Sequence, residues 1–260
     1  AETSFTIAVA SVNDAPVCST QPVVSGTASV GQTVTVDNGV WNDPADQPAG
    51  TFTYAIRWQS ATDASGANLA TVGEGASFTV AVGQRHAFIR ALVSVTDTDA
   101  SGAVTVDAAT PWVQVNNESP VLNRTADALA MQEDAAATTI TLTATDADED
   151  ALHWSASSAT LGAVSVQDGV VAYTPTADAN GEDAFTVTVS DDYGGEATCD
   201  FAVLIQAVND PPSLTLGEDP LVAEDCAAQQ LTGWVQALNP GAANESDQTL
   251  GFTITNNTNT

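Results

Sequence analysis

A run of alternating apolar residues that ends in Asn-Asp-Pro occurs near both ends of this chain, with a looser copy between them. The clearest copy is FAVLIQAVNDPP at 201–212, the first is FTIAVASVNDAP at 5–16, and the looser one is WVQVNNESP at 112–120. Alternation with a period of two indicates a strand with one buried face. Proline cannot continue a strand ladder or a helix. Each copy therefore predicts the last strand of a folded unit, followed by a stiff exit.

Short alternating runs fill most of the remaining sequence. They are rich in Val, Thr, Ile, Phe and Tyr, and Gly, Asp, Asn and Pro separate them, as in FTYAIRW, AFIRALVSV and DAFTVTVSD. Strands that recur every ~8–12 residues between turn residues predict an all-β sandwich or barrel. Helical spacing is suggested only by Ala-rich patches such as ADALAMQEDAA at 126–136.

The three copies also give a period. Asn13, Asn116 and Asn209 close their runs at separations near the ~100 residues of an immunoglobulin-like sandwich. We predict the last strand of a preceding repeat at 1–14, complete sandwiches at 15–117 and 118–210, and the first half of a further repeat at 211–260. The chain is then a window from a longer, elongated array.

The charge excludes several classes of function. The 260 residues include 33 Asp and Glu but only four Arg and no Lys, which gives a net charge of −29. Nucleic acid is excluded as a partner because neutralising phosphates needs Lys and Arg clusters, and an anionic membrane surface is disfavoured for the same reason. No apolar run reaches the ~18 residues of a membrane span. So acidic a chain either lives in high salt or binds cations, and Ca²⁺ suits carboxylate oxygens.

Cysteine and histidine usage argues against catalysis and zinc. Cys18, Cys199 and Cys226 are too few and too dispersed for a disulfide framework or a zinc site. One disulfide with a free thiol, an intermolecular bridge and isolated buried thiols all stay open. His86 and His153 have no Ser or Cys partner nearby in the sequence, so we predict that the chain is not an enzyme.

Several motifs resemble known repeats. Segment 118–210 resembles the cadherin-like repeats of large calcium-binding bacterial surface adhesins with RTX-type arrays, through ATDADEDALHW, YTPTADANGEDAFTVTVSD and the closing VNDPP. Segment 15–117 is similar to bacterial Ig-like repeats, through SGTASVGQTVTV, YAIRWQ and IRALVSVTDTDASG. The family motif Asp-x-Asp-Gly-Asp appears here with Glu149 in place of Gly.

The resemblance implies tandem immunoglobulin-like and cadherin-like Greek-key β-sandwiches at the bacterial cell surface or outside the cell. It also implies Ca²⁺ between repeats. The implied partners are neighbouring repeats of the same chain or identical subunits, with surface glycans or other cells as further partners.

Strand order turns the acidic motifs into a candidate metal site. In a seven-stranded sandwich, the loop after the second strand and the loop before the last strand lie at the end where the chain enters. In segment 118–210 these loops are DADED at 146–150 and SDDYGG at 190–195, and the linker NNES at 116–119 reaches the same end. Gathered carboxylates repel each other unless a cation neutralises them. The predicted calcium ligands there are Asn116, Asn117, Glu118, Asp146, Asp148, Asp150 and Asp191.

Two further sites follow from the same reasoning. At the far end of segment 118–210, a turn with Glu133 faces the next linker, which carries Asn209 and Asp210. At the start of segment 15–117, the ligands would be Asn13, Asp14, Asp97 and Asp99. Because Asp and Asn are also ordinary turn residues, a solvated acidic loop is the alternative for each cluster.

We therefore expect a structural or adhesive repeat region of an extracellular bacterial surface protein or filament, made rigid by calcium between its domains. A second hypothesis is a polymer subunit assembled by donor-strand complementation, in which SFTIAV of one copy completes the C-terminal half domain of another. A third is a carbohydrate-binding accessory region, which requires an exposed aromatic platform. Trp58, Trp112 and Trp154 are instead predicted to anchor cores.

Overall fold

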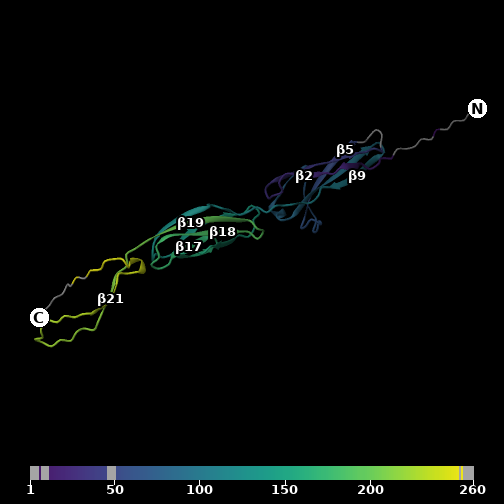
Figure 1. Cartoon of the computed structure of the whole chain (residues 1–260). Helices are drawn as coiled ribbons and strands as arrows, with labels where there is room; N and C mark the ends of the chain where they lie inside the picture. The colour runs from purple at the N-terminus through teal and green to yellow at the C-terminus, as the bar shows by residue number, and fades with distance from the viewer. Residues whose placement is uncertain (1–5, 7–11, 46–50, 252, 254–260) are drawn as a thin grey trace, which may run out of the picture. The chain divides into compact units, whose positions relative to one another are not determined.

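The computed structural model describes residue 6 and residues 12–45, 51–251 and 253. These residues belong to two compact units. Unit 1 comprises Ala1–Val121, Ala144–Leu152 and Ser190–Ala197, and unit 2 comprises Leu122–Thr143, His153–Val189 and Thr198–Thr260. Regular structure in the described ranges is β-strand apart from two short 3-10 turns (Figure 1). The predicted all-β class is confirmed.

The strands of unit 1 form two facing layers. One sheet has the order β10-β8-β5-β6, with β9 also paired to β8, and the other has the order β2-β3-β7, while β1 pairs with β4. The bounds are β1 (Val17–Thr20), β2 (Val23–Ser25), β3 (Thr33–Asp37), β4 (Val40–Asn42), β5 (Thr51–Ala61), β6 (Ala70–Glu74), β7 (Ser77–Thr79), β8 (Phe88–Asp99), β9 (Gly102–Ala109), β10 (Val113–Gln114), β14 (Ala144–Thr145) and the 3-10 turn η1 (Val82–Gln84).

The core of unit 1 lies between these layers. Trp58 on β5 is fully buried and packs with Val34 of β3 and Ile89 of β8. Its ring stacks on Phe78 at a centroid distance of 5.5 Å, and its Nε1 donates to the carbonyl of Gly75 at 2.9 Å. Burying an aromatic side chain supplies a large share of core energy, and a buried indole needs an acceptor for its N–H. The prediction that Trp58 anchors a core is confirmed.

Unit 2 holds a second sandwich. One sheet has the order β12-β19-β18-β15 and the other has the order β13-β17-β16. The bounds are β12 (Ala126–Gln132), β13 (Thr138–Thr141), β15 (His153–Ala156), β16 (Gly162–Gln167), β17 (Val170–Pro175), β18 (Gly181–Ser190), β19 (Glu196–Gln206), β20 (Ser213–Leu216), β21 (Val235–Asn239) and the 3-10 turn η2 (Ala243–Glu245); β11 (Val121–Leu122) lies where the two sequence ranges meet. The chain crosses between the sheets after β12, β13, β15 and β17, which is the Greek-key pattern of an immunoglobulin-like sandwich.

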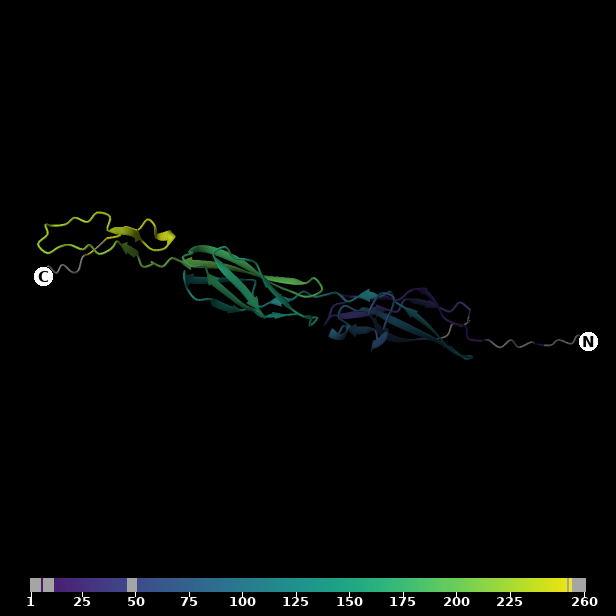
Figure 2. The ribbon, with the colours of Figure 1, turned by 90° about the horizontal axis from the view of Figure 1, so that it is seen from below.

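The core of this sandwich is built from alternate residues of β18 and β19. Figure 2 shows the two layers of strands in the green part of the chain. Phe185, Phe201 and Val203 are buried, whereas their direct neighbours along each strand are exposed or half-buried. The rings of Phe185 and Phe201 stack at 4.6 Å, and Phe185 also stacks on Tyr173 of β17 at 5.7 Å. The copy FAVLIQAV is therefore the last strand of a sandwich, as its alternation predicts.

The Ala-rich segment 126–136 is not helical. Ala126–Gln132 forms β12, which pairs in parallel with β19 from Ala126↔Asp200 to Gln132↔Gln206. Its exposed residues alternate with half-buried ones and with the buried Met131, which faces the core. Alanine favours helices only weakly as a prior, and tertiary pairing overrides it here.

Segment 211–260 contributes the antiparallel ladder β20–β21. Its apolar side chains Leu214, Leu216 and Leu238 are all more than 40% exposed. Every strand of the described residues lies inside one of the predicted segments, and the boundaries themselves stay predictions. The strand expected at 5–12 lies, except for residues 6 and 12, outside the described residues.

Two sequence-level expectations have direct outcomes. Cys18 is half-buried, Cys199 is buried and Cys226 is exposed, and all three are free thiols. No helix in the described ranges is long and apolar enough to cross a membrane.

Candidate metal centres

The loop DADED of unit 1 is shaped by its first aspartate. Asp146 Oδ1 accepts hydrogen bonds from the backbone N–H groups of Asp148 at 2.8 Å and Asp150 at 3.3 Å. Glu149 has a φ of 57°, in the left-handed region, at the position where the family motif has Gly. The resulting turn brings one oxygen each of Asp146, Asp148 and Asp150 within 4.8 Å of one another. Glu149 thus adopts a backbone conformation that glycine would favour.

The left-handed φ of Glu149 leads to a prediction. Left-handed backbone costs a non-glycine residue about 1–2 kcal/mol, whereas glycine loses about 0.5–1 kcal/mol more conformational entropy on folding. We expect Glu149→Gly to raise the free energy of unfolding by about 0.5–1 kcal/mol in EDTA, measured by urea denaturation. Ala147→Gly is the matched control, because Ala147 has no positive φ, and should lower it. Destabilisation by both variants would contradict the strain argument.

Two consecutive linker residues join this loop to the second predicted loop. The Glu118 backbone N–H donates to Asp148 Oδ2 at 2.6 Å. The side chain of Asn117 donates from Nδ2 to Asp191 Oδ2 at 2.9 Å. Asp191 Oδ1 accepts from the amides of Tyr193 and Gly195 at 2.7 and 2.8 Å. The linker and both acidic loops thus meet within unit 1, and Glu118 does so through its backbone.

Burial and like charges set the electrostatics of this cluster. Asp148 is completely buried, and burial raises the pKa of its carboxyl; the N–H of Glu118 lowers that pKa by less, and the charges of Asp146 and Asp150 raise it further. Burial also raises the pKa of Asp191, but the hydrogen bonds from Asn117 and the loop amides outweigh it, so that pKa is lowered. Asp148 is therefore the carboxylate that most needs a positive partner.

Three oxygens of this cluster are buried without a hydrogen-bond partner among the described residues. They are Asn117 Oδ1, Asp146 Oδ2 and Asp148 Oδ1. An unpaired buried carboxylate oxygen is energetically costly, and native structures rarely keep several together without water or an ion. Carboxylate and amide oxygens are hard ligands that suit Ca²⁺. The residues present therefore fit a calcium ion, with these three atoms as the open ligands.

Basic and aromatic residues that the sequence reasoning left out also reach this cluster. His86 Nε2 lies 3.0 and 2.8 Å from the two carboxylate oxygens of Asp150, and Arg85 Nε lies 3.5 Å from Asp150 Oδ1. The ring of Tyr193 stacks on His86 at 3.4 Å. No motif marks Arg85 and His86, because they follow the unremarkable turn η1. Only the small number of cations in an acidic chain could have drawn attention to them.

Unit 2 holds a second carboxylate cluster, formed by Glu133, Asp134, Asp178, Asp210 and Glu245. One oxygen each of Asp134, Asp178 and Asp210 lies within 4.8 Å of the others. The backbone N–H of Asp178 donates to Asp134 Oδ1 at 3.1 Å, and that of Asp210 donates to Glu245 Oε1 at 2.9 Å. The first hydrogen bond joins the turn before β13 to the turn before β18, and the second joins the segment after β19 to η2.

Glu133 organises this second cluster. Its Oε1 accepts from the Val208 backbone N–H at 2.7 Å, and its Oε2 accepts from the side chain of Asn180 at 3.0 Å and that of Asn244 at 3.4 Å. These hydrogen bonds, that of Val208 foremost, lower the pKa of Glu133. The turn of Glu133 therefore faces the linker after β19, as the sequence predicted.

The second cluster is more acidic than the first. Burial raises the pKa of the Asp210 carboxyl most. The negative charges of four nearby carboxylates raise that pKa further; they belong to Asp178, Glu245, Asp134 and Glu133. Asp210 Oδ2 and Glu245 Oε2 are buried without a hydrogen-bond partner among the described residues, and Glu245 is 8% exposed. None of the ion pairs found in the described residues reaches this cluster. These residues also fit a divalent cation with oxygen ligands.

Sequence reasoning named Glu133, Asn209 and Asp210 for this site, and the structure adds others. Asn209 is exposed, and its side chain donates to the carbonyl of Asp210 and accepts from Gln248 Nε2. Asp134 and Asp178 lie in turns with positive φ, and the sequence reasoning did not name them as ligands. Their proximity to Asp210 depends on contacts between distant segments.

The remaining predicted ligands are less gathered. The side chain of Asn13 is buried and donates from Nδ2 to the carbonyls of Asp97 and Gly102 at 3.2 and 3.0 Å. Asp97 is fully buried, and Asp14 is exposed. Asp99 Oδ1 accepts from the N–H and hydroxyl of Ser101. In the described part of the chain these residues do not form a group of three close ligand atoms.

Asn116 serves the fold of unit 1. It forms an isolated parallel bridge with Ser29, its backbone N–H donates to the carbonyl of Ala28 at 2.7 Å, and its side chain is exposed. Its neighbour Asn117, by contrast, turns its side chain towards Asp191. Of the two linker asparagines, only Asn117 offers an open buried oxygen.

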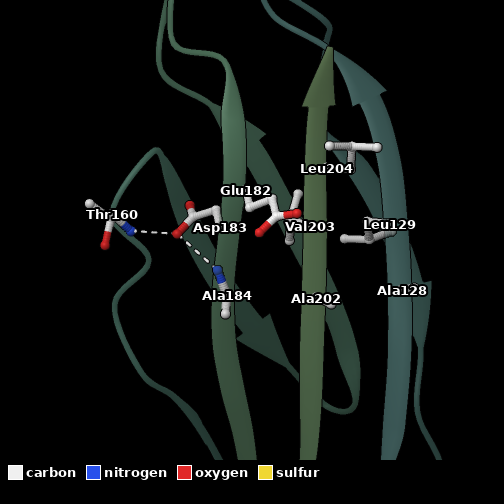
Figure 3. Close-up of a pocket in the computed structure, with 9 residues that line it drawn as sticks. All are labelled: Ala128, Leu129, Thr160, Glu182, Asp183, Ala184, Ala202, Val203 and Leu204. Carbon is white, nitrogen blue, oxygen red and sulfur yellow. Dashed lines mark hydrogen bonds between the residues drawn. The ribbon is translucent and has the colours of Figure 1, made fainter.

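A depression on the outer side of β12, β18 and β19 also bears a carboxylate pair (Figure 3). Glu182 and Asp183 both line it, but Figure 3 shows Asp183 turned towards Thr160, whose N–H it accepts at 2.9 Å. Asp183 is 8% exposed and also accepts from Leu161, Ala184 and Tyr173. All four donors belong to the protein itself, so the role of Asp183 is to hold the fold of this sandwich together.

Comparison with known protein families finds a match that covers the second sandwich. Residues 117–204 match the family model described as Bacterial Ig domain. Segment 118–210, which contains most of this stretch, was compared above with cadherin-like repeats, and the likeness to bacterial Ig-like repeats was drawn for segment 15–117. The predicted resemblance of the chain to bacterial cadherin-like and Ig-like repeats is confirmed. No curated protein matches the chain.

Solved structures with similar architecture come from cadherins and titin. The protocadherin gamma B2 extracellular cadherin domains 1–5 share 13% identity at a TM-score of 0.37, over 74% of this chain and 39% of that one. Drosophila N-cadherin EC1-4 shares 14% identity with this chain at a TM-score of 0.34. The match covers 77% of this chain and 54% of that one. The titin domains Z1Z2 in complex with telethonin share 14% identity with this chain at a TM-score of 0.35. The match covers 76% of this chain and 100% of that one. The chain thus spans less than two thirds of these two cadherin structures.

Proposed function

We propose that this chain is a structural or adhesive repeat region of an extracellular bacterial surface protein, and that calcium ions fix its linkers to the adjoining acidic loops. The match of residues 117–204 to the Bacterial Ig domain model supports the general role of a structural or adhesive repeat. The calcium part of the proposal rests on the buried, unpartnered oxygens of Asn117, Asp146 and Asp148 in unit 1. The corresponding oxygens of Asp210 and Glu245 in unit 2 support it as well.

The physical role of the ion follows from these contacts. Each cluster joins a segment that follows a last strand, 116–118 or 208–210, to acidic turns that lie far away in the sequence. Without a cation, like charges in a partly buried site repel one another. Calcium would replace this repulsion with six to eight oxygen contacts. The linker would then lose its freedom to rotate, and successive repeats would act as a stiff rod.

Calcium is expected to raise the melting temperature of the chain. An ion that binds only the folded state stabilises it by about 2.7 kcal/mol at about 100 times its Kd, which raises the melting temperature of a ~100-residue domain by about 10 °C or more. Calorimetry and small-angle scattering in EDTA and in millimolar Ca²⁺ measure the stability and the spread of conformations. Identical curves in both would sink the proposal.

The controls must separate binding from screening, since a net charge of −29 responds to any salt. NaCl at matched ionic strength and Mg²⁺ at matched concentration serve this purpose. Asp148→Asn should remove the calcium response of unit 1, and Glu245→Gln should remove that of unit 2. An equal response to NaCl would assign the effect to screening alone.

The other hypotheses have less support. All five tryptophans are buried or half-buried, and the ring of Trp112 is covered by Arg90 at 4.4 Å, which disfavours an aromatic platform for sugars. Donor-strand complementation stays a hypothesis, because its donor segment, apart from residue 6, lies outside the described residues. An immunoglobulin-like fold typically carries no catalysis, and the expectation that the chain is not an enzyme otherwise stays a prediction.

A further inference from the structure

Asp150 differs from the other two aspartates of its loop because both of its oxygens are engaged. His86 Nε2 lies 3.0 Å from Oδ1 and 2.8 Å from Oδ2, and Arg85 Nε lies 3.5 Å from Oδ1. The Asp150 side chain is only 4% exposed. A buried carboxylate that already pairs with a guanidinium attracts a second cation less strongly.

The two basic residues are held in place by further contacts. Arg85 Nη1 donates to the backbone carbonyl of Asp148 at 3.2 Å, so the guanidinium contacts the loop at two points. The His86 ring stacks on Tyr193 with an interplanar angle of 13°. His86 also has a left-handed φ of 57°, a conformation that needs support from its surroundings. These contacts make a built site rather than a chance surface pair.

The open oxygens of the cluster lie elsewhere. Asp146 Oδ2, Asp148 Oδ1 and Asn117 Oδ1 have no partner, whereas neither oxygen of Asp150 is open. We propose that Asp150 is not a calcium ligand but the anchor that ties the DADED loop to Arg85 and His86 without any metal. The ion is then held by Asn117, Asp146 and Asp148. This assignment of ligands rests on the proposed function, but the metal-free anchor does not.

The ligand assignment is tested by amide hydrogen exchange of residues 144–152 across a calcium titration of the full chain. The triple variant Arg85→Gln/His86→Gln/Asp150→Asn removes the whole group at once and leaves no buried charge unpaired. We expect its midpoint calcium concentration to stay within about threefold of the wild type, and Asp148→Asn to raise it at least about tenfold. A tenfold rise in the triple variant, with a normal wild-type response, would show that Asp150 is a ligand.

The anchor is tested in EDTA, where the ion plays no part. We expect Asp150→Asn to speed exchange in residues 144–152 by about tenfold, because local opening no longer breaks an ion pair. Glu149→Gln is the matched control, since Glu149 is exposed in the same loop, and it should change the rate less than about twofold. Equal rates in the two variants would overturn the anchor. A wild type whose loop ignores calcium would overturn the ligand assignment together with the proposed function, and the EDTA comparison would still decide the anchor.

Discussion

Replacing Asp183 by alanine is expected to lower the free energy of unfolding of the second sandwich by about 3–5 kcal/mol. Its carboxylate accepts the hydroxyl of Tyr173 at 2.6 Å and the N–H groups of Thr160, Leu161 and Ala184 at 2.8–2.9 Å. Tyr173 is fully buried. The substitution would leave the buried Tyr173 hydroxyl and the three N–H groups without their acceptor, and unsatisfied buried donors are costly.

Urea denaturation at neutral pH measures this effect. Glu182→Ala is the matched control, since Glu182 is the preceding residue on β18 and is exposed; it should change the free energy of unfolding by less than about 0.5 kcal/mol. Asp183→Asn should fall between the two, because an amide retains one acceptor oxygen. Equal stabilities of the Asp183 and Glu182 variants would show that the network contributes nothing.

The pH dependence of the same group has a definite sign. Burial raises the pKa of Asp183, but the hydrogen bond from Tyr173 and those from the three amides outweigh it, so the folded-state pKa is lowered. Its contribution is fully present above the unfolded pKa of about 3.9 and is lost as the pH falls through the lower folded value. The stability difference between wild type and Asp183→Asn should therefore stay constant from pH 7 to about pH 5 and shrink below about pH 4.

Replacing Phe201 by alanine is expected to lower the free energy of unfolding by about 3–5 kcal/mol, through lost burial and the cavity left behind. Phe201 is 1% exposed and stacks on Phe185 at 4.6 Å in the centre of the sandwich. Leu204→Ala is the control on the same strand, because Leu204 is 46% exposed. It should cost less than about 1 kcal/mol. Similar losses for both would mean that β19 does not present alternate faces to core and solvent.

The strands could be predicted where alternation was strong. In β19, every second residue of FAVLIQ is buried, as the period of two requires. The prediction was least informative for β12, where alanine carries little signal and pairing with β19 decides the conformation. The 3-10 turn η1 and the placement of Arg85 and His86 after it followed from no pattern.

The candidate sites also divide into features that the sequence predicts and features that depend on tertiary contacts. Counting strands predicted that DADED and SDDYGG lie near the linker, and the contacts of Glu118 and Asn117 place both loops there. The role of single residues could not be predicted. Asp150 contacts Arg85 and His86, Asp183 accepts four hydrogen bonds in a buried position, and Asp178 lies close to Asp134 and Asp210. Asp is equally common in turns, caps and metal sites, so its sequence position alone does not distinguish them.

The sequence by itself determined the all-β class, the recurrence of strand-ending Asn-Asp-Pro motifs and the acidity that makes cations the natural ligands. These properties depend on periodicity and composition, which act locally or over the whole chain. Only the tertiary structure decided which oxygens are left open and which are already neutralised, because burial and pairing depend on residues far apart in sequence. Asp146, Asp148 and Asp150 are equivalent in the motif. In the fold, two of them keep an open oxygen and the third is held by Arg85 and His86.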